Sequence, residues 1–421
     1  IRLSLVGSEM CIRDRFTVNS VPRHGLTISR LRYIISNGEI TEQRGNNMKQ
    51  HWASVWGNAI SIGENRPEGY NRNITFRYPI YSQFGGTAVR LTFDNFCGTE
   101  PVTFNKVTAF IGGKFYPVTF GGNREATVGA GENIVSDELP CEVEPQSLIT
   151  VSFWFRDFTL LRSAVFTSGP LTEGYYAIGD MTETELIPKE IERGISVIYF
   201  LSNVSVLTSA ENRTVVCYGD SITAQDWPEY LTLRCNREEK LHTAVIRRAA
   251  SGTRMLREYN CITYESYGLM GSKRFSHEVP TDGADTVIIQ HGINDIIHPV
   301  GTEVNPFRPM SDMPTAQELA DCMKYYIEQA RGLGYKVYVG TLLPIEGWRT
   351  YAPFREDVRG QFNEWIRTTD LIDGCIDFDR ALADPERPTR MLPQFDSGDH
   401  LHPSKMGYKQ MADIVPGEIL R

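Results

Sequence analysis

Ser221 follows a short apolar segment, residues 215–218, from which only Gly219 and Asp220 separate it. This pattern is typical of a buried strand that delivers a serine to the carboxyl edge of a parallel sheet, where α/β sites lie. A serine hydroxyl at such an edge can act as a nucleophile if a base takes its proton. The alternative is structural, because small and acidic residues also begin helices as N-caps.

A candidate base stands far downstream, where His402 follows Asp399 by three residues. At this spacing the carboxylate can accept a hydrogen bond from one ring nitrogen while the other nitrogen faces a serine. Pro403 can begin a helix at its first turn, so that both side chains would lie at a helix start. His400 is the competing candidate, but it is adjacent to Asp399 and the local geometry favours His402. Together with Ser221, this pair predicts a serine hydrolase.

Two small-residue turns contain candidate donors for an oxyanion, the charge that develops when an ester carbonyl is attacked. Asn294 follows the strand expected over residues 286–290, and its side chain carries N–H groups. Gly252 ends the turn of residues 249–252 and lets its backbone N–H approach a ligand closely. Each turn is also ordinary loop material, so only the combination of these turns with Ser221 points to acyl transfer.

The hydrophobic pattern after about residue 212 predicts the elements that position these side chains. Strands are expected over residues 215–218, 286–290, 336–343 and 374–378, and helices around residues 319–330 and 358–366 and after Pro403. Strands that alternate with helices form a parallel sheet covered on both faces, so the second half of the chain is predicted to be an α/β domain.

The preceding region has a different period. Residues 89–93 alternate between apolar and polar side chains, as do residues 149–155, and glycine-rich turns separate such runs. Short alternating strands at this spacing predict an antiparallel β-sandwich. The Trp-containing segment 52–56 is expected to pack against it. The expected domains are therefore a sandwich with its connecting segment over residues 16–205 and a catalytic α/β domain over residues 206–421.

The elements in the order Ser-Gly-Asn-His resemble the SGNH hydrolase family, also called GDSL esterases. The resemblance covers roughly residues 212–421 and rests on Gly219-Asp220-Ser221, Gly252, Gly292-x-Asn294 and Asp399-x-x-His402. It implies a three-layer α/β/α fold with an open, shallow active site. It also implies roles for the matched residues: Ser221 as nucleophile, His402 as general base and acid, Asp399 as the orienting partner, and the Ser221 N–H, the Gly252 N–H and the Asn294 side chain as the oxyanion hole.

The upstream segments 87–98, 101–120 and 136–155 are similar to the jelly-roll-like β-sandwich that precedes the SGNH domain in a bacterial subfamily. Several members of such two-domain groups are carbohydrate esterases. One departure concerns the loop after the nucleophile motif, where many relatives have an acidic residue and a glycine. This chain has Ala224-Gln225 and then Trp227-Pro228, and the shorter loop changes the rim of the expected pocket.

Four residues of the expected post-strand loops are candidates for substrate contacts. They are Asp220 in the nucleophile motif, His298 in the loop after Asn294, and Trp348 and Tyr351 in the loop after the third expected strand. An aromatic platform suits a sugar ring, and ordinary loop packing is the alternative for each.

We therefore expect a serine esterase that removes small acyl groups, foremost acetyl, from carbohydrate or related esters through an acyl-enzyme, with no metal or organic cofactor. One alternative is a general short-chain aryl or alkyl ester hydrolase; a phospholipase or thioesterase is less favoured, since the sequence has no obvious apolar lid. Another is a carbohydrate-binding protein with a dead site, which the complete Ser/Asp/His/Asn set disfavours. The expected partner is a small-molecule or oligosaccharide ester, and a homo-oligomer remains open.

Composition disfavours several other classes of protein. The chain has 421 residues, 41% of them hydrophobic, a formal net charge of −9 and a pI near 5.5. No Lys/Arg block indicates a nucleic-acid partner, and no apolar run approaches the ~20 residues that span a bilayer. The eight cysteines lack the spacing of a zinc site, so free thiols in a reducing compartment are favoured over a disulfide framework.

The first fifteen residues fit no continuing pattern. They resemble a translated vector or sequencing-adaptor tract of the kind found in metagenome assemblies, with a genuine N-terminal strand as the alternative. The native N-terminus can therefore be missing, and since no signal peptide is visible, a cytoplasmic location is favoured over secretion.

Overall fold

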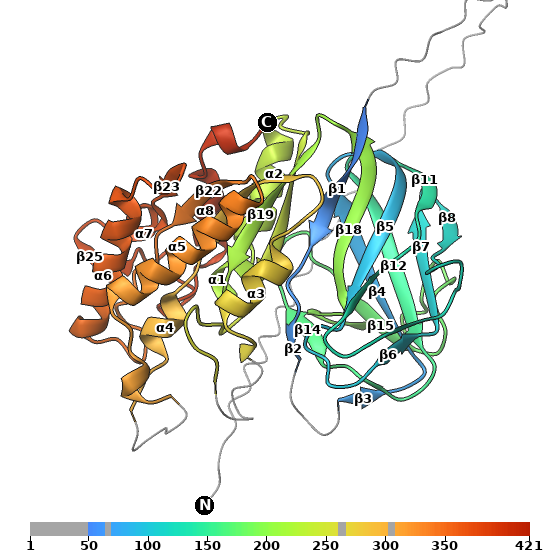
Figure 1. Cartoon of the computed structure of the whole chain (residues 1–421), viewed down its shortest axis with the longest axis horizontal. Helices are drawn as coiled ribbons and strands as arrows, with labels where there is room; N and C mark the ends of the chain where they lie inside the picture. Colours follow the sequence, from blue (N-terminus) through green and yellow to red (C-terminus); the bar gives the residue numbers. More distant parts are fainter. Residues whose placement is uncertain (1–48, 64–68, 260–266, 302–307) are drawn as a thin grey trace, which may run out of the picture. The chain divides into compact units, whose positions relative to one another are not determined.

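The structure, a computed structural model, describes residues 49–63, 69–259, 267–301 and 308–421. The expected N-terminal tail, residues 1–15, lies outside this part of the chain. The described residues form one compact unit, in which a region of antiparallel strands precedes an α/β region (Figure 1).

Two antiparallel sheets make up most of the first region. The strand order in one sheet is β1 (Gln50–Gly57), β18 (Leu201–Ser209), β5 (Gly86–Asp94) and β10 (Asn133–Val135), with β11 (Leu139–Val143) also paired to β5. The order in the other is β16 (Arg193–Gly194), β15 (Tyr175–Ile178), β4 (Ile74–Ser82), β12 (Ser147–Phe155), β7 (Lys106–Ile111) and β8 (Lys114–Pro117). Smaller sheets join β17 (Val197–Tyr199) to β14 (Ser163–Phe166) and β2 (Ser61–Ile62), β13 (Thr159–Leu160) to β3 (Tyr70–Asn71), and β6 (Val102–Phe104) to β9 (Ala126–Val128).

Alternation along the strands explains why the two large sheets face each other. On β12 the inward residues Val151 and Phe153 are fully buried. The Phe153 ring lies edge to face against Phe93 of β5, with 5.4 Å between the ring centroids, so side chains of both sheets meet in one core. The arrangement agrees with a β-sandwich, while the jelly-roll-like connectivity stays a prediction. Residues 52–56 do more than pack against this sandwich, because they are part of β1.

The sandwich ends later than the predicted boundary at residues 205 and 206. β18 continues to Ser209 and pairs with both β1 and β5, so it belongs wholly to the first sheet. Only residues 210–212 separate it from β19 (Arg213–Gly219), the strand that leads to Ser221. The two regions are therefore joined by a turn and not by a linker.

The α/β region is built on one parallel sheet, as predicted. Its strand order is β20 (Thr243–Ala249), β19, β21 (Ala284–Gln290), β22 (Lys336–Gly340) and β23 (Gly374–Ile376). Two strands are shorter than expected, because the backbone N–H of Leu342 donates to the Asn363 side chain and the Asp377 side chain caps the next helix. A β24 (Ala383–Asp384) and β25 (Arg387–Met391) pair follows.

Helices cover both faces of this sheet. They are α1 (Ser221–Ala224), α2 (Trp227–Arg237), α3 (Gly271–Glu278), α4 (Ile293–Ile297), α5 (Ala316–Gly332), α6 (Pro353–Thr368), α7 (Phe378–Leu382) and α8 (Lys405–Asp413), with 3₁₀ turns η2 (Met310–Asp312) and η3 (Gly417–Ile419). Tyr218 on β19 contacts the rings of Phe275 on α3 and Tyr326 on α5. Its neighbour Cys217 points to the opposite face, because side chains alternate along a strand.

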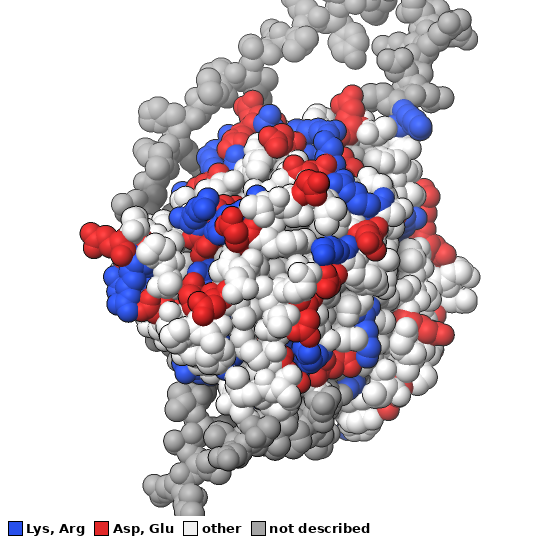
Figure 2. All heavy atoms as spheres, turned by 60° about the vertical axis from the view of Figure 1, so that its left-hand side comes forward, with Lys and Arg blue, Asp and Glu red and all other residues white. Residues whose placement is uncertain are grey.

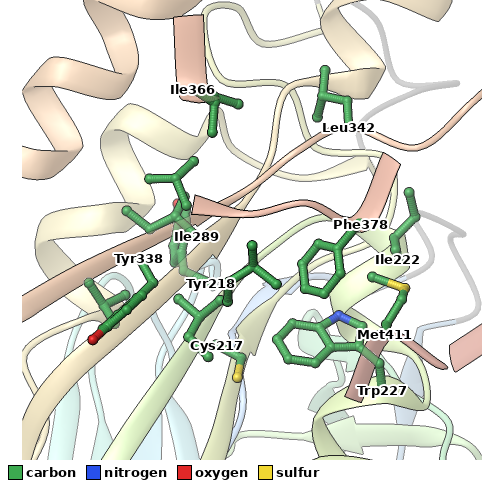
Figure 3. Packing of buried hydrophobic residues seen from close by; sticks show 14 of the residues in the cluster. Cys217, Tyr218, Ile222, Trp227, Ile289, Tyr338, Leu342, Ile366, Phe378 and Met411 are labelled. Atoms are coloured by element: carbon green, nitrogen blue, oxygen red, sulfur yellow. The ribbon is translucent and has the colours of Figure 1, made fainter. Parts of the chain in front are cut away.

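The face opposite α3 and α5 is filled around Trp227 of α2. The Trp227 ring lies 5.6 Å from that of Phe378, and both are fully buried. Figure 3 shows Met411 of α8 gathered with them beside Ile222 of α1. The helix that begins at Ser221 is thus anchored by apolar packing directly behind it.

Two neighbouring arginines on β20 join the α/β region to the sandwich. Arg248 donates to the carbonyl oxygens of Asn58 at 2.7 Å and Ser202 at 2.6 Å, and to the side chain of Asn203 at 2.9 Å. Arg247 donates to the carbonyl oxygen of Ser168 at 2.5 Å. Both arginines are buried, so the sandwich supplies acceptors that a guanidinium needs away from water.

The surface in Figure 2 mixes charges of both signs, with Lys and Arg side chains interspersed among Asp and Glu. Among the described helices, none has the length and apolar character that a membrane crossing requires.

A protein that begins at Ala210, without the sandwich, should be insoluble or much less stable than the full chain. Arg248 would lose all three of its acceptors, and β20 would become an open sheet edge. Solubility and thermal melting of the two proteins test this. If the shortened protein is monomeric, melts like the full chain and keeps full activity on a small aryl ester, the sandwich is an independent module.

Candidate active site

Ser221 lies at the corner between β19 and α1, where the sequence predicted a strand-to-helix transition. Asp220 is the N-cap of α1, and its carboxylate accepts the N–H of Ile222 at 3.1 Å. Ser221 is 8% exposed and Asp220 is fully buried. The N-cap role of Asp220 explains why an aspartate directly precedes Ser221. Asp220 therefore supports the helix start from inside, which corrects the expectation that it contacts substrate.

The structure brings Ser221, His402 and Asp399 into one hydrogen-bonded chain. The Ser221 Oγ lies 2.9 Å from Nε2 of His402, and Nδ1 of His402 lies 2.6 Å from Oδ2 of Asp399. An ionised carboxylate can only accept hydrogen bonds, so Nδ1 carries the ring proton. Nε2 is then free to accept the proton of the Ser221 hydroxyl, which is the arrangement a nucleophilic serine needs.

The loop before α8 holds the carboxylate of Asp399 in place. Its other oxygen, Oδ1, accepts the backbone N–H groups of Leu401 at 2.9 Å and His402 at 2.8 Å and the hydroxyl of Ser397 at 3.1 Å. Partial burial alone would raise the pKa of Asp399, but the hydrogen bonds from His402 and Leu401 outweigh it and hold the pKa well below its ordinary value. Asp399 is thus ionised throughout the neutral range.

The competing pair of the same loop is separate from Ser221. Asp396 Oδ2 lies 2.6 Å from Nδ1 of His400, and His400 has a φ of +64°. The ring of His400 packs beside Gly347, where an added Cβ would lie 2.6 Å from it. Asp396 therefore orients His400, and Asp399 is the carboxylate that contacts His402.

The two predicted oxyanion turns lie against each other. Asn294, at the start of α4 and 2% exposed, donates from Nδ2 to the carbonyl oxygen of Thr253 at 3.0 Å. Gly252 has a φ of +79°, and a Cβ there would lie 2.2 Å from the Tyr267 ring, so only glycine fits. Within the described residues, no acceptor takes up the backbone N–H of Ser221 or of Gly252. Their roles as oxyanion donors stay a prediction.

Two residues missed by the sequence reasoning fasten these turns together. Asp295 accepts the backbone N–H of Met255 at 2.7 Å and of Leu256 at 3.0 Å. His291 lies 3.2 Å from the carbonyl oxygen of Thr253, and burial lowers its pKa to about 3, so it stays neutral. Both residues flank the Gly292-x-Asn294 motif directly, and that position was the available signal.

Of the other predicted substrate contacts, His298 is placed unfavourably. It is 5% exposed, its Nδ1 is hydrogen-bonded with the Tyr259 hydroxyl, and its ring stacks on Tyr267 with 5.3 Å between centroids. Burial lowers the pKa of His298 to about 3. His298 therefore packs behind the Gly252 turn, because two tyrosines enclose it, and the expected substrate contact is corrected.

Trp348 and Tyr351 lie on one turn after β22, where the N–H of Tyr351 donates to the carbonyl oxygen of Trp348 at 2.8 Å. Both side chains are half-buried and pack against the core of the α/β region, and the guanidinium of Arg349 lies 4.6 Å from the Trp348 ring centroid. Their contact with a substrate stays a prediction.

Comparison with known proteins bears on the α/β region. Residues 217–410 match the model of the GDSL-like lipase/acylhydrolase family. A search of curated proteins gave no match. Among solved structures, the chain is similar to a GDSL-like lipase from Bacteroides thetaiotaomicron VPI-5482, with 19% identity over 49% of this chain and 87% of that chain and a TM-score of 0.33.

Two further solved structures are similar over the same share of the chain. One is a member of the lipolytic protein G-D-S-L family from Veillonella parvula DSM 2008, with 17% identity, 48% of this chain, 95% of that chain and a TM-score of 0.33. The other is a catalytic mutant of an acetylxylan esterase from Geobacillus stearothermophilus, with 19% identity, 48% of this chain, 91% of that chain and a TM-score of 0.36.

Asp399→Asn should cut turnover of an ester steeply, by roughly 10⁴-fold, while folding and KM change little, because an amide favours the wrong tautomer of His402. Asp396→Asn is the matched control from the same loop and should leave turnover within a few-fold of the wild type. Steady-state kinetics on both variants test the assignment. A larger loss in Asp396→Asn would show that the wrong carboxylate has been identified.

The buried carboxyl of Asp220 predicts a pH dependence of stability. Burial raises its pKa to about 7, although the N–H of Ile222 and the ring of His402 oppose this. The folded protein then holds a proton that the unfolded chain releases near pH 4, so the free energy of unfolding should fall between about pH 4 and 7. Asp220→Asn keeps an oxygen for the Ile222 N–H and should flatten this fall.

The measurement is chemical denaturation of both proteins between pH 4 and 8. Asp137→Asn is the control, since hydrogen bonds from Thr119 and Gly122 lower the pKa of that carboxyl, so it stays ionised over this range and its variant should give a curve parallel to that of the wild type. Curves for the wild type and Asp220→Asn that run parallel over this range would refute the prediction.

Proposed function

Residues 217–410 form a GDSL-like lipase/acylhydrolase domain, and from this premise we propose that the protein is a serine esterase that removes small acyl groups, foremost acetyl, from carbohydrate or related esters. The observation that carries the proposal is the hydrogen-bonded chain from Ser221 through His402 to Asp399. Hydrolysis is the activity of the family, and the acyl group and the alcohol are the proposed part.

In the first half of the reaction, the Ser221 Oγ attacks the ester carbonyl carbon while its proton passes to Nε2 of His402. The carbonyl oxygen becomes an oxyanion, toward which the N–H groups of Ser221, Gly252 and Asn294 would donate. The bond to the alcohol oxygen then breaks, and that oxygen takes the proton from His402. The products are the free alcohol and an acyl group esterified to Ser221.

In the second half, a water molecule attacks the acyl carbon and gives one proton to Nε2 of His402. The bond to Ser221 Oγ breaks, the serine recovers the proton, and the carboxylic acid leaves. Throughout, Asp399 keeps the ring oriented and stabilises its positive charge without taking the proton itself.

The preference for a carbohydrate alcohol is supported by the exposed polar residues that lie beside His402 at the edge of the site. The departing alcohol oxygen must lie near Nε2 of His402, because it receives that proton. The neighbouring segment, residues 397–400, is exposed and consists of Ser, Gly, Asp and His. A polar rim suits an alcohol that carries further hydroxyl groups better than a long alkyl chain.

The test is pre-steady-state hydrolysis of an acetylated sugar and of 4-nitrophenyl acetate. The wild type should release a burst of nitrophenol and carry an acetyl group on the peptide that contains Ser221. Ser221→Ala should lose at least about 10³-fold in rate. The exposed Ser276 on α3 offers a matched control, since Ser276→Ala should keep the wild-type rate.

Two results would overturn the proposal. Turnover of aryl and alkyl esters with none of acetylated sugars would favour the general short-chain esterase. No turnover of any ester, with sugar binding intact, would favour a binding protein.

A further inference from the structure

A groove of about 310 Å³ lies where the sandwich meets the Gly252 turn. Its lining includes Ser61 of β2, Ala164 and Phe166 of β14, Val197 and Tyr199 of β17, and Ser251 of the α/β region. We call it the β14 groove. Its volume falls in the range of small ligand sites, which begins at about 300 Å³.

The β14 groove adjoins the predicted oxyanion hole. Ser251, which lines it, is the residue directly before Gly252. The preceding residue, Ala250, donates its N–H to the carbonyl oxygen of Gly219 at 3.2 Å, so this turn runs beside the corner that carries Ser221. The groove therefore lies next to the turn that carries Gly252.

The continuation of β14 is fastened to the segment just after the nucleophile helix. The Ser168 hydroxyl donates to Asp226 at 2.8 Å, and Arg247 bridges the carbonyl oxygens of Ser168 and Ala224 at 2.5 and 3.1 Å. The sandwich wall of the groove thus has a fixed position relative to α1.

The wall of the groove that the sandwich supplies is mainly apolar and contains one polar group, a serine hydroxyl. Ala164 pairs across the small sheet with Tyr199, and Phe166 pairs with Val197, so these four side chains share one face. Phe166 is 49% exposed, which is unusual for a large aromatic residue on a paired strand.

The polar group in this wall is the hydroxyl of Ser61. This serine is 4% exposed, pairs with Ala164 and therefore belongs to the same face. Its hydroxyl has no hydrogen-bond partner in the part of the chain that the structure describes. A buried hydroxyl without a partner is unfavourable, and a ligand hydroxyl in the groove would satisfy it.

We propose that the β14 groove binds the alcohol part of the ester substrate, a sugar residue whose apolar face rests on Phe166 and one of whose hydroxyl groups bonds to Ser61. The proposal rests on the esterase function above and deepens it. An alkyl acyl chain would pack against the apolar side chains of the groove but leave the Ser61 hydroxyl without a partner. A sugar ring has both an apolar face and hydroxyl groups, so it can satisfy both. Phe166 is then a specificity-determining residue of the sandwich.

The experiment compares Phe166→Ala with the wild type in the full chain on two series of esters. The first keeps the acetyl group and changes the alcohol from methanol to a methyl glycoside. The second keeps methanol and lengthens the acyl group from acetate to hexanoate. Phe166→Ala should lower kcat/KM for the acetylated glycoside about tenfold, through KM, and leave methyl acetate within twofold.

Matched variants separate contact from folding. Phe158→Ala removes another exposed phenylalanine of the sandwich, 66% exposed and outside the groove, and should change nothing. Phe166→Tyr keeps an aromatic ring and should restore most of the rate on the glycoside. Ser61→Ala should lower kcat/KM for the acetylated glycoside and leave kcat/KM for methyl acetate unchanged.

Each other outcome overturns the proposal. A change in the acyl-length profile with unchanged discrimination between alcohols would make the groove an acyl site. Equal loss on every ester would mean that Phe166 is structural, and no loss would mean that the groove is not used. Failure of the esterase function itself looks different, because the wild type would then hydrolyse none of these esters.

Discussion

The contact between the edge strand β20 and the sandwich holds the two regions of the molecule together. An uncovered edge presents unpaired backbone groups, and here Arg247 and Arg248 of that strand donate to carbonyl oxygens of the sandwich. A buried guanidinium without acceptors is costly, so the two regions stabilise each other's polar groups. Because β20 also leads into Ser251 and Gly252, the contact that covers the edge also positions the predicted oxyanion turn.

A second set of contacts fastens the active-site turns across the sheet. Asn294 and His291 follow β21, yet both contact the carbonyl oxygen of Thr253 after β20. Asp295 holds the next two backbone N–H groups. Preorganised donors stabilise a developing charge without rearranging during the reaction, so these second contacts explain why the turns adopt one geometry.

Electrostatics differ between the carboxyl groups of the site. Asp399 is surrounded by donors, and its pKa is held low, so it can stabilise an imidazolium at neutral pH. Asp220 and Asp295 are fully enclosed, and burial raises their pKa values to about 7 and about 6. The difference follows from the number of N–H donors and the access of water, and it agrees with the predicted orienting role of Asp399.

The sequence by itself determined the α/β class and the parallel sheet, and it singled out Ser221, Asp399 and His402 as the predicted catalytic residues, because apolar periodicity and residue order along the chain report local structure. It could not determine the end of the sandwich, since β18 pairs with β1 and β5, strands more than a hundred residues away. It also misjudged Asp220 and His298, whose burial arises from distant packing. The β14 groove was invisible for the same reason: strands β2, β14 and β17 meet Ser251 only when the whole chain has folded.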